Sequence, residues 1–287
     1  MAFLIRSLFR ALSGLPLSVL HAFGWVVGWL SFGLSSRYRQ RLFAHAAQAG
    51  YPRRVALATV AESGKLVTEL PRLWLGRPVP VEWAGAEHID AALAQGTGVL
   101  FLTPHLGCFE ITAQAYAKRY GATHPMTVLF RPARKPWLRD LVAGARQRPG
   151  LFAAPTTLAG VKQLIKALKA GQAVGLLPDQ VPPQGQGVWA PFFGRDAYTM
   201  TLSARLAQAG RVQILLSWGE RLPWGRGYRV HVRPFEILNA GPLSTDADEA
   251  ARQINRAMEA LVRECPAQYL WSYDRYKQPH RSAPPSP

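Results

Sequence analysis

His105 and Glu110 form a pair of side chains in this 287-residue sequence whose types and spacing suggest acid–base chemistry. A carboxylate hydrogen-bonded to one imidazole nitrogen fixes the tautomer of the ring and makes the other nitrogen a better proton acceptor. On one continuous helix, residues five apart point about 140° away from each other and could not meet. At a sharp corner they can meet, and Gly107 gives the backbone freedom for one. We therefore predict that His105 is a general base for a hydroxyl or amine nucleophile and that Glu110 orients it. The alternative from spacing alone is a capping or packing role.

The elements around this pair are predicted to be a strand, a turn and a helix. Residues 99–102 are an apolar run with the length and composition of a buried strand. A proline and a glycine end this run, and residues 109–120 have a helical pattern with basic side chains in the last turn. His105 and Glu110 therefore lie where the carboxyl end of a strand meets the start of a helix, which is the usual place for a reactive site in an open α/β sheet.

Apolar runs of strand length alternate with helical patterns along the rest of the chain. Strands are predicted at residues 126–130, 173–177, 212–218 and 228–234, and helices at 53–76, 137–148, 158–170, 198–209 and 246–265. This alternation indicates an α/β domain with a mostly parallel central sheet flanked by helices. We expect the domain to cover residues 43–277, between an N-terminal membrane anchor with basic flanks at 1–42 and a disordered tail at 278–287.

The charge of the chain predicts acidic partners. Its 34 Lys and Arg against 17 Asp and Glu give a formal net charge of +17, and its pI is near 10.6. Such a chain attracts anionic lipid headgroups, acidic proteins or nucleic acid. We disfavour nucleic acid, because no helix-turn-helix, zinc-finger or RNP-like pattern occurs. Cys108 and Cys265 cannot form a disulfide framework, which fits a reducing cytoplasmic setting, and no Cys or His spacing is typical of a metal site, so we expect no metal.

Residues 11–34 contain no Asp, Glu, Lys or Arg and are long enough to cross about 30 Å of hydrocarbon. Two tryptophans within the segment and arginines on either side are typical anchors at a membrane interface. A serine, a proline and His21 lower the hydrophobicity, so a helix lying in the interface and a buried core helix are the alternatives to a span. The arginines that follow the segment favour a cytoplasmic position for the rest of the chain.

Four blocks follow one another in a specific order. They are HLGCFE at 105–110, FRP at 130–132, LPDQ at 177–180 with WAPFFG at 189–194 and Thr199, and QYLW at 268–271 with RYK at 275–277. The first is an H-x4-E element, which is a weak signal alone, whereas the ordered set is a strong one. Together with the apolar N-terminus, the set resembles the bacterial lipid A biosynthesis (late) acyltransferases of the lauroyl and myristoyl type, within the membrane glycerolipid acyltransferase group. The resemblance covers nearly the whole chain.

The resemblance implies a glycerolipid acyltransferase-like fold with an N-terminal membrane-anchoring helix. It implies transfer of a fatty acyl chain from acyl carrier protein to a hydroxyl of a Kdo-bearing lipid A precursor, at the cytoplasmic face of the inner membrane. His105 would deprotonate the hydroxyl, and Glu110 would stabilise the charged imidazole. No acyl-enzyme and no cofactor beyond the thioester donor would be needed, so Cys108 would be a buried, inert thiol. Backbone amides after His105, or an arginine, would stabilise the oxyanion.

Five further residues are predicted to bind the substrate: Arg131, Arg146, Asp179, Gln180 and Arg275. A guanidinium suits the phosphates and sugar carboxylates of the precursor. Asp179 follows a buried strand and could position a sugar hydroxyl or a basic side chain, and Arg275 lies near an aromatic patch, where membrane contact and a structural role are both open. Two other functions stay open: a related glycerolipid, lysophospholipid or ornithine-lipid acyltransferase, and a catalytically silent membrane adaptor.

Overall fold

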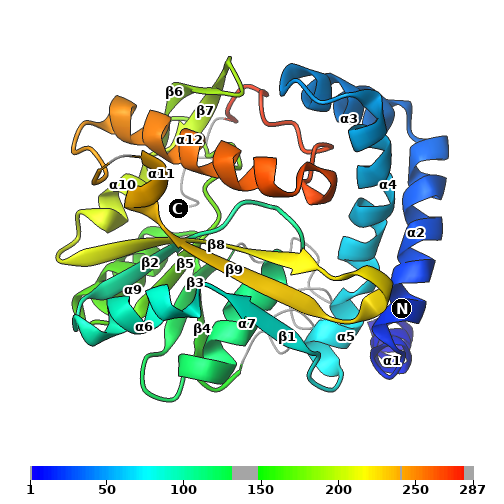
Figure 1. Cartoon of the computed structure of the whole chain (residues 1–287), viewed down its shortest axis with the longest axis horizontal. Helices are drawn as coiled ribbons and strands as arrows, with labels where there is room; N and C mark the ends of the chain where they lie inside the picture. The colour runs from blue at the N-terminus through cyan, green and yellow to red at the C-terminus, as the bar shows by residue number, and fades with distance from the viewer. Residues whose placement is uncertain (1, 131–147, 240, 281–287) are drawn as a thin grey trace, which may run out of the picture.

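The computed structural model describes residues 2–130, 148–239 and 241–280 (Figure 1). Its centre is a seven-stranded sheet with the strand order β1-β9-β8-β2-β5-β3-β4. The strands are β1 (Val81–Ala84), β2 (Gly98–Leu102), β3 (Met126–Phe130), β4 (Leu151–Pro155), β5 (Ala173–Leu176), β8 (Val212–Arg221) and β9 (Tyr228–Pro234). Neighbouring strands are parallel except β8 and β9, which form an antiparallel pair. The prediction of a mostly parallel sheet is confirmed.

Successive residues of β2 point into two apolar cores, one on each face of the sheet. Val99 and Phe101 belong to the core that α6 and α7 cover, and Leu100 and Leu102 belong to the larger core under α9, α10 and α12. The helices over the sheet are α6 (Ala86–Ala94), α7 (Phe109–Tyr120), α9 (Leu158–Lys169), α10 (Leu202–Ala207), α11 (Phe235–Asn239) and α12 (Ala247–Glu264). Because helices cover both faces, every residue of β2 is buried, as expected for a central parallel strand.

A β-hairpin replaces the start of the helix predicted at residues 198–209. Its strands β6 (Gly187–Phe192) and β7 (Arg195–Met200) are antiparallel and joined by Phe193 and Gly194. These two residues have φ values of 47° and 75°, and positive φ at both positions is what a two-residue type I′ turn requires. The edge strand β4 was also not predicted, because it is short and its burial does not alternate with period two. The helix predicted at 137–148 lies outside the described residues except for its last position.

The apolar N-terminal segment folds as two helices separated at Pro16. The N-terminal helices are α1 (Ala2–Ser13), α2 (Leu17–Leu34), α3 (Ser36–Gln48), α4 (Arg53–Thr68) and α5 (Leu70–Leu75). α2 lies alongside α4 (Figure 1), and the glycines Gly24 and Gly28 on α2 face Gly64 on α4. A Cβ atom on Gly64 would stand 1.8 Å from the carbonyl oxygen of Gly24. The close approach of α2 and α4 therefore requires glycine at position 64.

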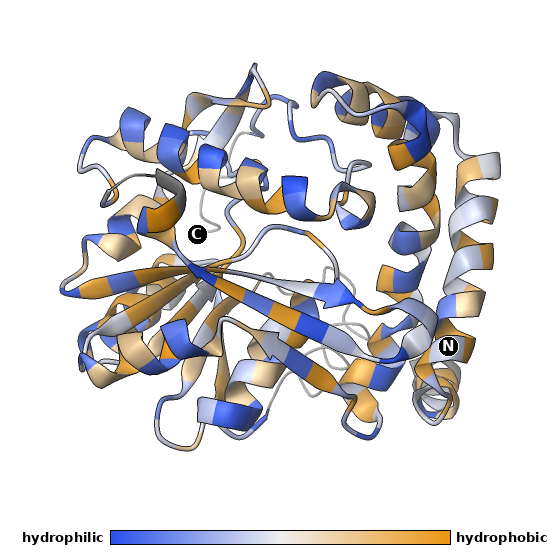
Figure 2. Ribbon diagram, in the orientation of Figure 1, coloured by the Kyte–Doolittle hydropathy of each residue, from blue (hydrophilic) through white to orange (hydrophobic). Residues whose placement is uncertain are grey.

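The opposite face of α2 is apolar and exposed. It carries Val19, Phe23, Val26 and Leu30, and Figure 2 shows apolar residues along the length of this helix. Within the described residues, α2 is the helix long and apolar enough to cross a membrane. The predicted anchor is therefore a helix with one face packed on the domain and one exposed apolar face.

Candidate active site

His105 lies on the turn after β2, and Asp179 lies on the loop after β5. These strands are parallel neighbours, with Leu102 opposite Leu176, so their carboxyl ends lie side by side. A proline soon follows each strand and ends its hydrogen-bonding pattern. The sheet order thus brings together two residues that are 74 positions apart in the chain.

The carboxylate of Asp179 holds His105 at two points. Its Oδ1 atom is 2.7 Å from Nδ1 of the imidazole, and its Oδ2 atom accepts the backbone N–H of His105 at 2.8 Å. Burial alone would raise the pKa of Asp179, but the charge and hydrogen bonds of His105, together with nearby Arg275, hold that pKa below its usual value. An ionised Asp179 requires a proton on Nδ1, so in the neutral form of the imidazole the lone pair lies on Nε2.

The second nitrogen of the imidazole faces Gln180. The Nε2 atom of the Gln180 carboxamide is 3.0 Å from Nε2 of His105. The ring of Phe109 packs against the imidazole, with 4.9 Å between the ring centroids. The imidazole is 14% exposed, whereas the carboxylate of Asp179 is 2% exposed. His105 is therefore held through Nδ1 by a buried carboxylate, whereas its Nε2 atom lies next to a half-buried glutamine.

Glu110, which we predicted to orient the imidazole, contacts other groups. It is buried in the first turn of α7, where its Oε2 atom accepts the Nε1–H of Trp74 at 3.4 Å. Burial lowers the pKa of Arg148, and the charge of Glu110 raises it again, which places this carboxylate near Arg148. The carboxylate on Nδ1 of His105 is that of Asp179, because Asp179 follows the strand next to β2. This contact corrects the predicted pairing of the imidazole with Glu110.

The backbone N–H groups of residues 105–108 all have acceptors within the protein. The acceptors are, in order, the Asp179 carboxylate and the carbonyl groups of Pro104, Gln268 and Gly219, at 2.7 to 2.9 Å. Gly107 has a φ of 59°, and a Cβ atom there would stand 1.9 Å from the carbonyl oxygen of Gly219, so this position requires glycine. We predicted that amides after His105 stabilise an oxyanion; those of residues 106–108 are instead used to fix the turn.

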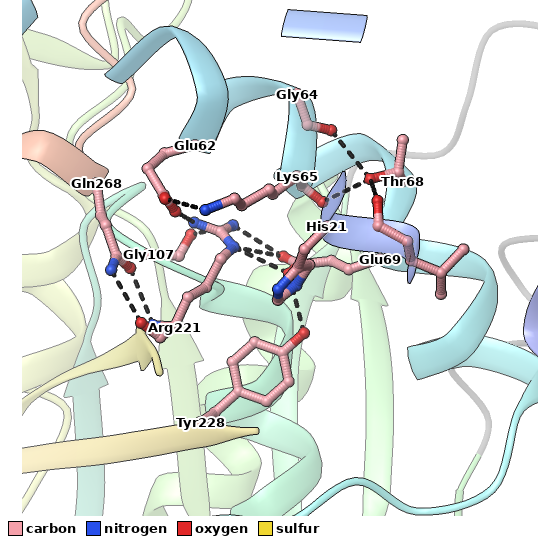
Figure 3. Close-up of polar contacts among 11 residues, drawn as sticks. His21, Glu62, Gly64, Lys65, Thr68, Glu69, Gly107, Arg221, Tyr228 and Gln268 are labelled. Atoms are coloured by element: carbon pink, nitrogen blue, oxygen red, sulfur yellow. Dashed lines mark hydrogen bonds and ion pairs between the residues drawn. The ribbon is translucent and has the colours of Figure 1, made fainter. Parts of the chain in front are cut away.

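A buried ion pair supports the same turn (Figure 3). Nη2 of Arg221 donates to the carbonyl oxygen of Gly107 at 2.8 Å, while Nε and Nη2 donate to the carboxylate of Glu69 at 2.8 to 3.1 Å. Glu69 also accepts hydrogen bonds from the Tyr228 hydroxyl at 2.9 Å and from Nε2 of His21 at 3.1 Å. Burial would raise the pKa of Glu69, but Arg221 and His21 lower it to about 2. Through this carboxylate, α2, β8 and β9 all connect to the turn that carries the imidazole.

Sequence patterns did not indicate Arg221 or Glu69. The two residues are 152 positions apart: Arg221 follows Glu220 at the end of β8, and Glu69 lies between α4 and α5, so no local pattern joins them. Removing either partner would leave a buried charge uncompensated, which typically costs about 3–5 kcal/mol. A charged residue within the otherwise buried β8 was the available signal, but it does not reveal its partner.

Arg275 is buried and serves the β6–β7 hairpin. Its guanidinium donates to the carbonyl oxygen of Tyr198 at 2.7 Å and to the hydroxyl of Thr199 at 2.8 Å. These contacts correct the prediction that Arg275 binds substrate and favour the structural alternative. Arg131 and Arg146 lie outside the described residues.

The thiol of Cys108 is fully buried, as predicted. Burial and the nearby carboxylate of Glu69 raise its pKa well above the usual value, so the reactive thiolate is disfavoured. In the part of the chain that the structure describes, no three His, Cys, Asp or Glu side chains gather as metal ligands. The described site presents the imidazole of His105 with two hydrogen-bonded neighbours, Asp179 and Gln180.

A narrow apolar cavity of about 40 Å³ lies between the sheet and α7. Its lining includes Phe109, whose ring packs on His105, and Leu177, which precedes Asp179 by two positions. Most of its other walls are apolar or aromatic and include Trp83, Ile89, Phe101, Tyr116, Met126 and Val128. The imidazole therefore packs on a residue that lines an apolar space.

Comparison with known proteins gives a consistent result. The family model described as bacterial lipid A biosynthesis acyltransferase matches residues 1–278. The lipid A biosynthesis lauroyltransferase of Escherichia coli (strain K12) is 28% identical over 217 residues, which cover 75% of this chain and 68% of that protein. A lipid A biosynthesis acyltransferase of Haemophilus influenzae is 26% identical over 192 residues, 66% of this chain and 57% of that protein.

The lipid A biosynthesis palmitoleoyltransferase of Escherichia coli (strain K12) is 26% identical over 197 residues, 67% of this chain and 60% of that protein. The matched stretches thus span 57% to 68% of the lengths of these three relatives. Because the family model matches nearly the whole chain, from its first residue to the C-terminal aromatic block, this protein belongs to the bacterial lipid A biosynthesis acyltransferase family.

Proposed function

We propose that this protein transfers a fatty acyl chain from acyl carrier protein to a hydroxyl of a Kdo-bearing lipid A precursor. The observation that carries the proposal is the imidazole of His105, braced by Asp179 and packed on Phe109, which lines an apolar cavity. Family membership and relatives named for lauroyl and palmitoleoyl transfer support a fatty acyl group as the group that is moved.

In the proposed reaction, Nε2 of His105 accepts the proton of the acceptor hydroxyl while the hydroxyl oxygen attacks the thioester carbonyl carbon. The tetrahedral oxyanion then collapses, the C–S bond breaks, and the leaving sulfur takes the proton back from Nε2. Asp179 stabilises the imidazolium between these two proton transfers. The acyl group passes directly to the acceptor, which fits a Cys108 thiol that is buried and has a raised pKa.

Glu110 remains the second carboxylate of the proposal. From the first turn of α7 it interacts with Trp74 and Arg148, and it lies one residue after Phe109, which packs on the imidazole. We assign it a positioning role in place of the predicted direct contact with His105.

The acyl chain is proposed to enter the cavity between the sheet and α7. Gly175 on β5 keeps part of this space open, because a Cβ atom there would stand 3.0 Å from a methyl carbon of Val128. The cavity is narrow, so chain entry requires movement of its walls, among them Phe109, which packs on His105.

The acidic partners are proposed to be acyl carrier protein and the anionic precursor in the cytoplasmic leaflet of the inner membrane. The net charge of +17 supports both, because a basic surface gains about 1 kcal/mol per Lys or Arg near an anionic leaflet. We propose that α2 lies in the membrane interface and does not span. A span would carry the closely packed α4, with Glu62 and Lys65, into the hydrocarbon, where charged side chains are costly.

The function is tested by incubating the purified protein with an acyl-carrier-protein thioester and the Kdo-bearing precursor, followed by mass spectrometry of the lipid product. The wild-type protein should add one acyl mass, and a folded His105→Ala variant should add none. Transfer at the wild-type rate by His105→Ala would refute the mechanism. Competing lysophospholipid, glycerolipid and ornithine-lipid acceptors in the same mixture identify the acceptor class, and a product from one of them alone would replace the lipid A precursor.

The membrane mode is tested with vesicles that contain anionic lipid. A Phe23→Asp exchange on the exposed face of α2 should release the protein from vesicles, whereas Phe152→Asp, on an exposed residue of β4, should not. Protection from proteolysis in sealed vesicles of the residues on one side of α2, with cleavage on the other side, would contradict the interfacial mode.

A further inference from the structure

The proposed transfer needs a hydrogen-bond donor for the thioester oxygen, which becomes negatively charged as the hydroxyl adds to the carbonyl carbon. Such donors are usually backbone amides close to the catalytic residue. Here the amides of residues 106, 107 and 108 donate to carbonyl groups of the protein at 2.7 to 2.9 Å. They cannot turn toward a substrate without loss of the turn that holds His105.

Among the described residues, the carboxamide of Gln180 places a donor within hydrogen-bond distance of Nε2 of His105. Nδ1–H of His105 is given to Asp179, so Nε2 of the imidazole is an acceptor and the Gln180 N–H group is the donor across the 3.0 Å contact. In the substrate-free site, the lone pair that must accept the hydroxyl proton is therefore already occupied. An acceptor hydroxyl needs the same place, within about 2.6–3.2 Å of Nε2.

The backbone on both sides of this side chain is fixed. Asp179 is held by its two hydrogen bonds to His105, and the amide of Val181 donates to the hydroxyl of Tyr273 at 2.9 Å. The side chain of Gln180 is half-buried and can rotate about its own bonds. A hydroxyl that enters thus displaces the carboxamide by about the width of one atom. The thioester carbonyl that the hydroxyl attacks lies about 3–3.5 Å from the attacking oxygen, so the displaced N–H groups are left beside this carbonyl.

We propose that Gln180 is a catalytic residue with two successive roles: it caps Nε2 of His105 in the free enzyme, and after the acceptor displaces it, it donates a hydrogen bond to the oxyanion of the tetrahedral intermediate. This inference rests on the proposed acyl transfer. Gln180 gains and loses no proton. The proton moves from the hydroxyl to Nε2 and then to the leaving sulfur, and the electron pair of the broken C–S bond leaves with the sulfur.

The test compares Gln180→Ala and Gln180→Glu with Gln184→Ala, a change of an exposed glutamine on the same loop. Loss of one oxyanion donor typically lowers kcat about 10²- to 10³-fold. We expect a loss of this size for both Gln180 variants, with an acceptor KM that does not rise, because the acceptor no longer has to displace the cap, and wild-type kinetics for Gln184→Ala. Gln180→Glu keeps the size of the side chain but has no N–H to donate, so it covers the case in which Gln180→Ala does not fold.

A second readout does not depend on acyl transfer. Diethyl pyrocarbonate acylates unprotonated imidazole, and mass spectrometry of the peptide with His105 measures its rate at that residue. Removing the cap should speed this modification about fivefold in Gln180→Ala and leave it unchanged in Gln184→Ala. An unchanged rate in Gln180→Ala would show that no cap exists.

The outcomes separate the two proposals. If His105→Ala is inactive but both Gln180 variants keep kcat within about threefold of wild type, acyl transfer stands and Gln180 is not the oxyanion donor, which points to the first turn of α7 instead. If His105→Ala is fully active, the proposed function itself fails. A large rise in acceptor KM with unchanged kcat in the Gln180 variants would reduce Gln180 to a binding residue and overturn the oxyanion role.

Discussion

Asp179→Asn is the substitution that most directly separates the observed site from the predicted one. Asp179 makes two short hydrogen bonds to His105, at 2.7 and 2.8 Å, from a carboxylate that is 2% exposed. Asparagine has nearly the same shape but no charge. Its amide either accepts Nδ1–H weakly or turns its N–H toward Nδ1, which moves the ring proton to Nε2 and removes the base.

The magnitude follows from these two contacts. A hydrogen bond to a charged partner contributes about 1.5–3 kcal/mol, so the loss of both amounts to about 3–6 kcal/mol in the state with a charged imidazole. That range corresponds to a fall in kcat of roughly 10²- to 10⁴-fold. The KM of the acceptor should change little, because Asp179 lies behind the imidazole and faces the protein interior.

The assay is the initial rate of acylated product with saturating thioester donor, with Glu110→Gln as the matched exchange of the other carboxylate. Glutamine at position 110 keeps an acceptor for the N–H of Trp74, so we expect a loss below roughly tenfold. Thermal unfolding of both variants checks that each is folded at the assay temperature. The reasoning is refuted if Asp179→Asn stays within threefold of wild type while Glu110→Gln loses transfer, because Glu110 would then be the residue that activates the imidazole.

Four further results are expected. Arg221→Lys should lower the free energy of unfolding by about 3–5 kcal/mol in urea titrations, because lysine cannot pair with both carboxylate oxygens of Glu69 and reach Gly107 as well; an unchanged midpoint would contradict this. The pKa of Glu69 falls from 4.5 to about 2 on folding, so its charged form stabilises the protein above pH 4.5, and about 3 kcal/mol of that stability should be lost as the pH falls from 4.5 toward 2; Glu69→Gln should flatten this part of the stability profile. Gly107→Ala should abolish transfer, since its Cβ atom would stand 1.9 Å from a carbonyl oxygen, and any activity above a tenth of wild type would be inconsistent with the turn described here. Gly175→Val should shift the preference toward shorter acyl donors in a competition assay, and an unchanged product distribution would place the acyl chain elsewhere.

Local patterns were sufficient for the elements that carry the site. The apolar run of β2, the glycine turn and the helix α7 were predicted with nearly the observed bounds. Strand length, turn residues and helix ends each depend on residues within a few positions of one another in the sequence. The same local view failed at Tyr198, where an aromatic and β-branched segment was read as the start of a helix. There the signal was the Phe193-Gly194 turn, whose positive φ values join two antiparallel strands.

The choice between two carboxylates could not be made from local patterns. Glu110 is five positions from His105, whereas Asp179 is 74 positions away. Which of them reaches Nδ1 depends on the strand order, because β5 pairs with β2 directly and delivers its carboxyl end to the same edge. Strand order depends on pairing between distant segments and cannot be read from a local pattern. The general rule that sites lie at the carboxyl ends of strands places Asp179 near the site, but it does not show that Asp179 is the partner of the imidazole.

The same dependence on distant contacts explains how the position of α2 is tied to the catalytic turn. His21 on α2 donates to Glu69, Glu69 pairs with Arg221, and Arg221 holds the carbonyl oxygen of Gly107, two positions after His105. Each link is buried, so a displacement of α2 leaves a charge without its partner in the protein interior, which is costly. The helix with the exposed apolar face and the turn that carries His105 are therefore held in one arrangement. With α2 in the proposed interfacial position, a precursor in the membrane would meet an imidazole whose position is set relative to that membrane surface.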